Sequence, residues 1–208
     1  MKKIIKYGLL LTAMVLLGYN AVYIRKLSDV VNSRPGKFDA KSYVQKLWAG
    51  RLQEKLDSAI DVNTLKESLQ TDPADGFGKY THALAIGNYR YAMVKGIAMV
   101  DVVKEDEVLV TIQSAQPFKA VVLTEFVYGN TLRDASGLID LQAFPNTGDL
   151  NGVSGELNKK VRQEVIPALK SMLKPGNKIE FTGAVELNKA HLRFDDIEIV
   201  PVRIKRIS

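Results

Sequence analysis

The chain has 208 residues, with 29 Lys and Arg against 23 Asp and Glu, a formal net charge of +6 and no cysteine. The lack of cysteine excludes disulfides, thiolate catalysis, cysteine-ligated metals and lipid attachment to an N-terminal cysteine. Five of the basic residues lie within the first 26 positions, where no acidic residue occurs. The rest of the chain is therefore close to neutral, and we expect no nucleic-acid binding.

The first predicted element is an apolar segment near the N-terminus. Three lysines precede an uncharged run over residues 7–24, and Arg25-Lys26 follows it. Its length approaches the roughly 20 residues that span a bilayer and exceeds the roughly 7–15 of a signal-peptide core. We predict an uncleaved signal anchor or transmembrane helix over residues 1–26, with signal cleavage as the alternative. A single-pass protein of the cytoplasmic membrane, with its body on the extracytoplasmic (periplasmic) side, follows from this prediction.

A linker and an amphipathic helix follow the anchor. Residues 27–38 hold many turn-forming residues, so we interpret them as a linker to one extracytoplasmic domain over residues 39–208. Asp39 is the predicted N-cap of a helix whose apolar residues recur at three- and four-residue spacing. Tyr43 and Trp48 on this helix are candidate partner-binding side chains, although a tryptophan on an apolar helix face is more typical of a core.

A second short helix and a series of strands complete the predicted domain. Asp61 caps this helix, and Asp72-Pro73 ends it. Strands are predicted over 91–103, 108–113, 121–128 and 138–141, then a helix over 153–173 kinked at Pro167, then strands over 178–186 and 191–204. Pro201 predicts an edge position or a bulge in the last strand.

The order of these elements is typical of an OB-type barrel, in which one helix separates three strands from the final two. We therefore predict an α+β fold. It consists of an OB-like antiparallel β-barrel with one inserted helix, preceded by N-terminal helices and a single transmembrane or signal-anchor helix.

The most distinctive stretch is Arg133-Asp134-Ala135-Ser136-Gly137. The planar fork of Arg133 suits a carboxylate or an acidic partner. The neighbouring side chains that could hydrogen-bond sugar hydroxyls are Asn130, Thr131, Asp134 and Asn146. The alternative is structural: Asp134, Ser136 and Gly137 form a turn, and Arg133 pairs locally. Residues alone leave both interpretations open.

Motifs for catalysis and metal binding are missing from the sequence. The two histidines, His82 and His191, show no metal-ligand spacing, and no G-x-S-x-G, P-loop or G-x-G-x-x-G motif occurs. The acidic residues at 105–107 and 195–196 belong to predicted turns, where solvated charge is the default interpretation. We therefore predict that the protein is not an enzyme and that it uses no metal and no cofactor.

Three stretches resemble a family of predicted periplasmic lipoproteins of unknown function, often encoded beside sugar ABC transporters. They are Thr131-Leu-Arg-Asp-Ala-Ser-Gly-Leu-Ile139, Phe144-Pro-Asn146 and Leu157-Asn-Lys-Lys-Val-Arg162. Members often carry a lipidation cysteine, which this chain lacks, so a protein anchor would replace the lipid. The resemblance implies no catalytic residue.

The anchor and this resemblance together favour a non-enzymatic, membrane-anchored accessory protein that assists a sugar ABC transporter. We expect it to contact the permease or the solute-binding protein through the N-terminal helices and residues 130–146. The alternatives are a small-ligand module whose barrel face binds a saccharide or an anion, and an envelope structural protein.

Overall fold

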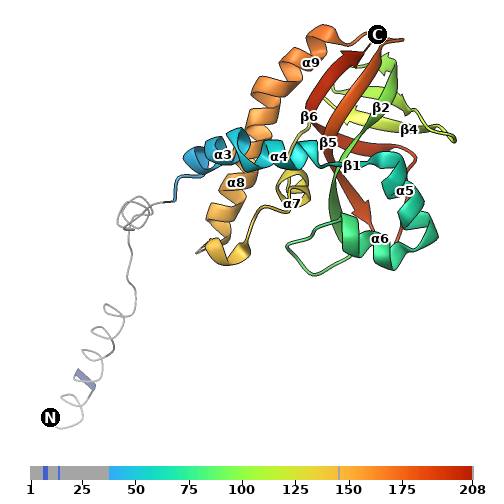
Figure 1. Ribbon diagram of the computed structural model, residues 1–208. Helices are drawn as coiled ribbons and strands as arrows, with labels where there is room; N and C mark the ends of the chain where they lie inside the picture. Colours follow the sequence, from blue (N-terminus) through green and yellow to red (C-terminus); the bar gives the residue numbers. More distant parts are fainter. Residues whose placement is uncertain (1–6, 9–13, 15–37, 145, 208) are drawn as a thin grey trace. The chain divides into compact units, whose positions relative to one another are not determined.

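The computed structural model describes residues 7–8, 14, 38–144 and 146–207 (Figure 1). The chain divides into two units, Met1–Phe38 and Asp39–Ser208. The predicted anchor and linker lie outside the described residues, apart from Tyr7, Gly8, Met14 and Phe38. Within the described part of the chain, no helix combines the length and the apolar character needed to cross a membrane.

The second unit begins with two consecutive helices, α3 (Ala40–Ala49) and α4 (Arg51–Asp57). Asp39 caps α3 as predicted, because its carboxylate accepts from the backbone N–H groups of the first turn. The sequence predicted one continuous helix, but Gly50 separates the two. Their apolar faces are buried at Val44, Leu47, Leu52 and Leu56.

Two further helices follow the two-residue strand β1 (Ile60–Asp61). Asp61 caps α5 (Val62–Thr71), and α5 ends just before Asp72-Pro73, as predicted. The same pair also begins α6 (Pro73–Tyr80), which the sequence analysis missed. Proline suits the first position of a helix, because the missing N–H has no intrahelical acceptor there.

Five strands form the barrel: β2 (Tyr89–Val103), β3 (Glu107–Ile112), β4 (Phe118–Leu123), β5 (Lys178–Asn188) and β6 (Ile197–Ile207). The sheet order is β1-β2-β3-β4-β6-β5, and pairing of β2 with β5 closes it. The predicted all-antiparallel arrangement is wrong in two places, because β1 runs parallel to β2 and β4 parallel to β6. Parallel neighbours need a long connection, and the chain between β4 and β6, which contains the inserted helix and β5, supplies it.

The barrel interior is apolar, and its deepest side chains include Val94, Val110, Ile112, Phe181 and Ile199. The predicted irregularity at Pro201 is confirmed, because the β5–β6 register shifts between Thr182 and Gly183, which pairs with Pro201. A Cβ on Gly183 would lie 2.6 Å from the Val200 carbonyl oxygen. The two strands therefore approach each other closely only because this residue is glycine.

The inserted helix is longer than predicted and has three parts, α8 (Thr147–Lys160), the π-helical turn η2 (Val161–Val165) and α9 (Ile166–Met172). It begins at Thr147 because the Asn146 side chain caps it, accepting from the Asp149 N–H at 2.9 Å. Pro167 brings no N–H for the Gln163 carbonyl, and the π turn occupies this place. In Figure 1, α8 and α9 run along one side of the barrel, with α3 crossing α8.

The strand predicted over residues 138–141 is wrong. This stretch instead follows the short helix α7 (Thr131–Ala135) and leads into the 3-10 helix η1 (Leu141–Ala143). Gly137 has a φ of 62°, which turns the chain after α7. The Asp140 carboxylate accepts from the Gln142 N–H and so begins η1. Two other predicted strands are shifted along the chain and are shorter. β4 begins and ends earlier than the predicted 121–128, and β6 begins and ends later than the predicted 191–204.

Candidate functional site

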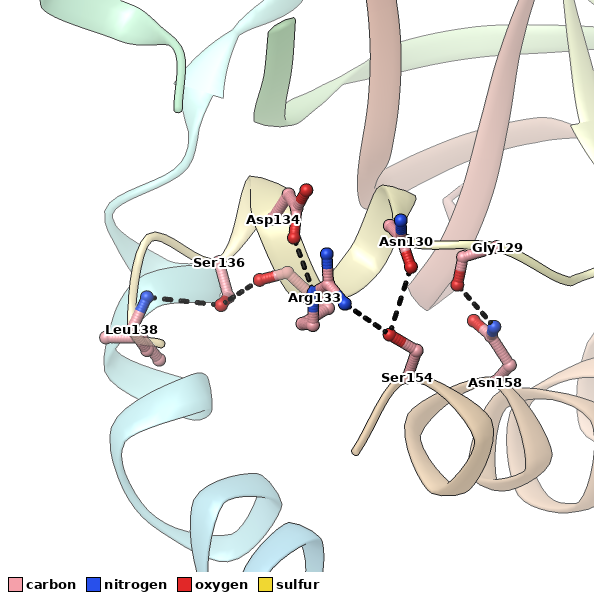
Figure 2. Close-up of polar contacts among 8 residues, drawn as sticks. All are labelled: Gly129, Asn130, Arg133, Asp134, Ser136, Leu138, Ser154 and Asn158. Atoms are coloured by element: carbon pink, nitrogen blue, oxygen red, sulfur yellow. Dashed lines mark hydrogen bonds and ion pairs between the residues drawn. The ribbon is translucent and has the colours of Figure 1, made fainter. Parts of the chain in front are cut away.

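The residues of the Arg133–Gly137 motif form a buried turn between the barrel and α8. We call α7 with Ser136 and Gly137 the α7 turn; it packs against β2 and β5. Arg133 is 5% exposed and Asp134 is 4% exposed, and Arg133 Nε lies 2.6 Å from Asp134 Oδ1 (Figure 2). The two charges are therefore withdrawn from water as a pair.

Hydrogen bonds extend this pair to α8 and along the turn (Figure 2). Arg133 Nη1 donates to Ser154 Oγ at 3.2 Å, and Ser154 Oγ donates to Asn130 Oδ1 at 3.2 Å. The Ser136 hydroxyl donates to the Arg133 carbonyl at 2.6 Å and accepts from the Leu138 N–H. Buried charges persist only when they are paired and hydrogen-bonded in this way.

Of the candidate ligand-binding residues, three come together and two do not. Asn130, Arg133 and Asp134 share the network around Ser154. Thr131 is half-buried at the start of α7. Asn146 caps α8, and its Nδ2 donates to Asp149 Oδ2 at 2.7 Å. The burial of Arg133 and Asp134 favours the structural interpretation of the motif, and a binding role for these residues stays a prediction.

The two candidate partner-binding aromatics on α3 are half-buried. The ring of Tyr43 meets that of Phe144 edge to face, with centroids 5.6 Å apart. Lys160 Nζ lies 5.3 Å from the centroid of the Trp48 ring. Both side chains thus pack between α3 and the region around α8, and each leaves part of its surface to solvent.

His82 is a neighbour of the α7 turn that sequence reasoning weighed only as a metal ligand. A Cβ on Gly137 would lie 2.6 Å from its ring, so the imidazole rests directly on this glycine. His82 Nε2 is 3.3 Å from Lys55 Nζ. Burial, followed by the charges of Lys55 and Arg90, lowers the pKa of His82 below its usual 6.5.

Tyr91 lies on β2 and pairs in register with Glu186 on β5. Burial and the hydrogen-bonded carboxylate of Glu186 raise the pKa of Tyr91 to about 12, with a further contribution from Asp134. The phenol therefore stays protonated well above neutral pH. This contact connects the surroundings of the α7 turn to the exposed face of β5.

The most exposed aromatics of this region precede the α7 turn. We call residues 124–130, which join β4 to α7, the aromatic loop. Phe126 is 62% exposed and Tyr128 is 65% exposed, while Val127 between them is buried. The sequence analysis missed this loop, because its Thr, Phe, Val and Tyr residues are typical of strands and extended the predicted strand to residue 128. The one available signal was Gly129, which takes a φ of 74°.

Two side chains of the inserted helix hold the aromatic loop in place. Arg162 Nη1 donates to the Val127 carbonyl, and its guanidinium lies 4.8 Å from the centroid of the Tyr128 ring. Asn158 Nδ2 donates to the Gly129 carbonyl at 2.9 Å (Figure 2). The loop is thus ordered by the helix and still presents two aromatic rings to solvent.

The described residues contain no group of three or more histidine or acidic side chains placed to hold a metal ion.

Comparisons with known proteins agree with the fold. A crystal structure of an OB-fold protein from Thermotoga maritima superposes with a TM-score of 0.71 at 24% identity, covering 82% of this chain and 99% of that one. It is one of 47 matching chains among the solved structures. At this identity the likeness shows the fold alone, and it confirms the OB-like architecture. The curated proteins contain no significant match.

The family model described as "Predicted periplasmic lipoprotein (DUF2291)" matches residues 12–205. This span includes the helices α3 to α9 and the whole barrel apart from the last residues of β6. The chain therefore belongs to the DUF2291 family of predicted periplasmic lipoproteins, which are tethered to the membrane on its periplasmic side.

Proposed function

We propose that this protein is a non-enzymatic accessory protein, anchored in the cytoplasmic membrane, that binds a component of a sugar ABC transporter through its aromatic loop. The observation that carries the proposal is the exposure of Phe126 and Tyr128 on a loop that Arg162 and Asn158 hold in place. The bound component is the permease or the solute-binding protein.

The composition of the loop supports protein binding. Phe126, Tyr128 and Arg162 are of the residue types enriched in interface cores, where tyrosine and arginine often supply much of the binding energy. The order imposed by Arg162 and Asn158 lowers the entropy that the loop would lose on binding. More than half of each ring lies outside the packed core, so this apolar surface is available to a partner.

The predicted anchor supports a partner in or near the same membrane. A transmembrane helix over residues 7–24 would supply, in a chain without cysteine, the attachment that a lipid supplies elsewhere. Attachment to one membrane raises the effective concentration of the domain near membrane partners, so a modest interface suffices. The resemblance to proteins encoded beside sugar ABC transporters supports the choice of transporter.

Affinity purification of the tagged full-length protein from gently solubilised membranes tests the proposal. We expect the permease or the solute-binding protein to co-purify, and the recovery to fall about tenfold or more when Phe126 and Tyr128 are both changed to serine. Ile86→Ser is the matched control, because this apolar side chain is exposed too but lies in the loop before β2.

Equal recovery of the transporter component with the Phe126→Ser/Tyr128→Ser variant would overturn the assignment of the aromatic loop. Recovery of no transporter component with the unaltered protein would overturn the accessory role itself.

A further inference from the structure

A cleft of about 390 Å³ lies at the other end of the Tyr91–Glu186 contact. Its floor is the exposed face of β5 with its neighbours on β2 and β6, and it includes Tyr89, Glu186 and Glu198. Its wall is the loop of residues 189–196 between β5 and β6, which contributes His191 and Arg193. The volume falls within the range of roughly 300–1,000 Å³ that is usual for small-molecule sites.

The wall of the cleft is anchored, although it is a loop. Phe194 is 6% exposed, and its ring meets that of Phe118 edge to face with centroids 6.1 Å apart. The Asp196 N–H donates to the Lys119 carbonyl at 3.1 Å, and the Ala190 N–H donates to Asn188 Oδ1 at 2.9 Å. The loop is therefore held at its start, its middle and its end, so the cleft is formed before any ligand arrives.

The side chains of the cleft suit a ligand with many hydroxyl groups. Arg193, His191 and the Asn188 amide supply donors, and Glu186 and Glu198 supply acceptors. Neither glutamate forms an ion pair with another described residue. Tyr89, 53% exposed, offers an aromatic face for the C–H side of a sugar ring. Four carboxylates line the cleft, which disfavours an anion.

We propose that this cleft binds a neutral saccharide, which stacks on Tyr89 and exchanges hydrogen bonds with Glu186, Glu198 and Arg193. The proposal is independent of the aromatic loop and of any protein partner. Tyr91 pairs in register with Glu186 across β2 and β5, so it lies next to the carboxylate that faces the sugar.

Saturation-transfer difference NMR on the detergent-solubilised full-length protein tests the proposal. The probes are D-glucose, D-galactose, D-ribose and maltose, with putrescine as a cationic comparison. We expect transfer to the ring protons of at least one sugar, and a dissociation constant raised about tenfold or more by Tyr89→Ser. Arg193→Ala is a second variant, on the wall of the cleft, and is expected to weaken binding of the same sugar.

Tyr128→Ser is the matched control, because it removes an exposed tyrosine outside the cleft and should leave sugar binding unchanged. Transfer to none of the four sugars would overturn the proposal, as would sugar binding that survives both cleft variants. Transfer to putrescine without transfer to any sugar would also overturn it, and would mark the cleft as a site for cationic amines. Loss of partner recovery in the aromatic-loop variant leaves this result untouched, so the two proposals fail separately.

Discussion

The aromatic loop and the α7 turn are adjacent in the chain, and yet they place their side chains in opposite ways. The turn buries an arginine and an aspartate that the sequence marks as distinctive, and satisfies them internally. The loop exposes Phe126 and Tyr128, which the sequence marks as ordinary strand residues. A distinctive polar motif can therefore exist because its residues are buried together and must satisfy one another. The surface available to a partner can be formed by residues that belong to no motif.

Arg133→Ala should have the largest effect on stability. It leaves the Asp134 carboxylate buried without its partner, and we expect the free energy of unfolding to fall by about 3–5 kcal/mol. Urea unfolding of the full-length protein in detergent measures this change. Arg206→Ala, at an exposed position on β6, is the control and should change stability by about 0.5 kcal/mol or less. A similar small effect for both variants would contradict the structural interpretation of the motif.

Gly137→Ala should be the next most damaging change in the α7 turn. Alanine at a φ of 62° costs about 1–2 kcal/mol, and its Cβ would lie 2.6 Å from the His82 ring. The clash is relieved in the double variant His82→Ala/Gly137→Ala, which should recover part of the loss. A double-mutant cycle in urea measures this coupling, and strict additivity of the two changes would show that the ring and the glycine do not interact.

Arg162→Ala tests whether the aromatic loop needs its contacts with the inserted helix. We expect a loss of only about 1 kcal/mol in stability, because one hydrogen bond to a carbonyl and one cation–π contact disappear. Partner recovery should nevertheless fall, although both aromatic rings remain. Arg162→Lys keeps the charge without the planar fork and should restore binding only in part. Full partner recovery with Arg162→Ala would show that the loop needs no support from the helix.

The smallest expected effect is on the pH dependence of stability. The pKa of His82 is lowered in the folded state from its usual 6.5. As the pH falls below about 6.5, the unfolded chain therefore binds a proton at His82 more readily than the folded chain does. The folded state should therefore lose stability as the pH falls from about 7.5 to about 5.5, and His82→Gln should flatten this decline. Urea midpoints at both pH values measure it. An unchanged slope in the variant would exclude His82 as the cause.

Much of the fold could be predicted because its signals are local. The caps at Asp39 and Asp61 and the apolar spacing of the inserted helix depend on residues within a few positions of one another. The ends of strands depend on contacts with distant residues or on single backbone hydrogen bonds in the turns that follow. β4 ends at Leu123 because the chain then turns tightly, with the Val127 N–H donating to the Glu125 carbonyl. The strand-forming residue types at 124–128 do not reveal such a turn.

The candidate sites were less predictable, because burial is a property of the tertiary structure. The adjacency of Arg133 and Asp134 is visible in the sequence, but their burial follows from packing of α7 against β2 and β5. The saccharide cleft likewise needs Tyr89, Glu186 and Arg193 to meet across strands and a loop. His191 was visible in the sequence, but its neighbours in the cleft were not.

Closure of the barrel has a consequence for the order of folding. The closing ladder pairs β2 with β5 along eleven residues of each strand, between positions about 80 to 100 residues apart. In a chain that emerges N-terminus first, β2 has no partner on this side until nearly the whole sequence is available. The open edge is then a site for wrong pairing with another chain. The yield of folded protein should therefore depend on how fast the last hairpin forms and pairs with β2, or on a chaperone that protects β2 until then. It should depend less on early collapse of the chain.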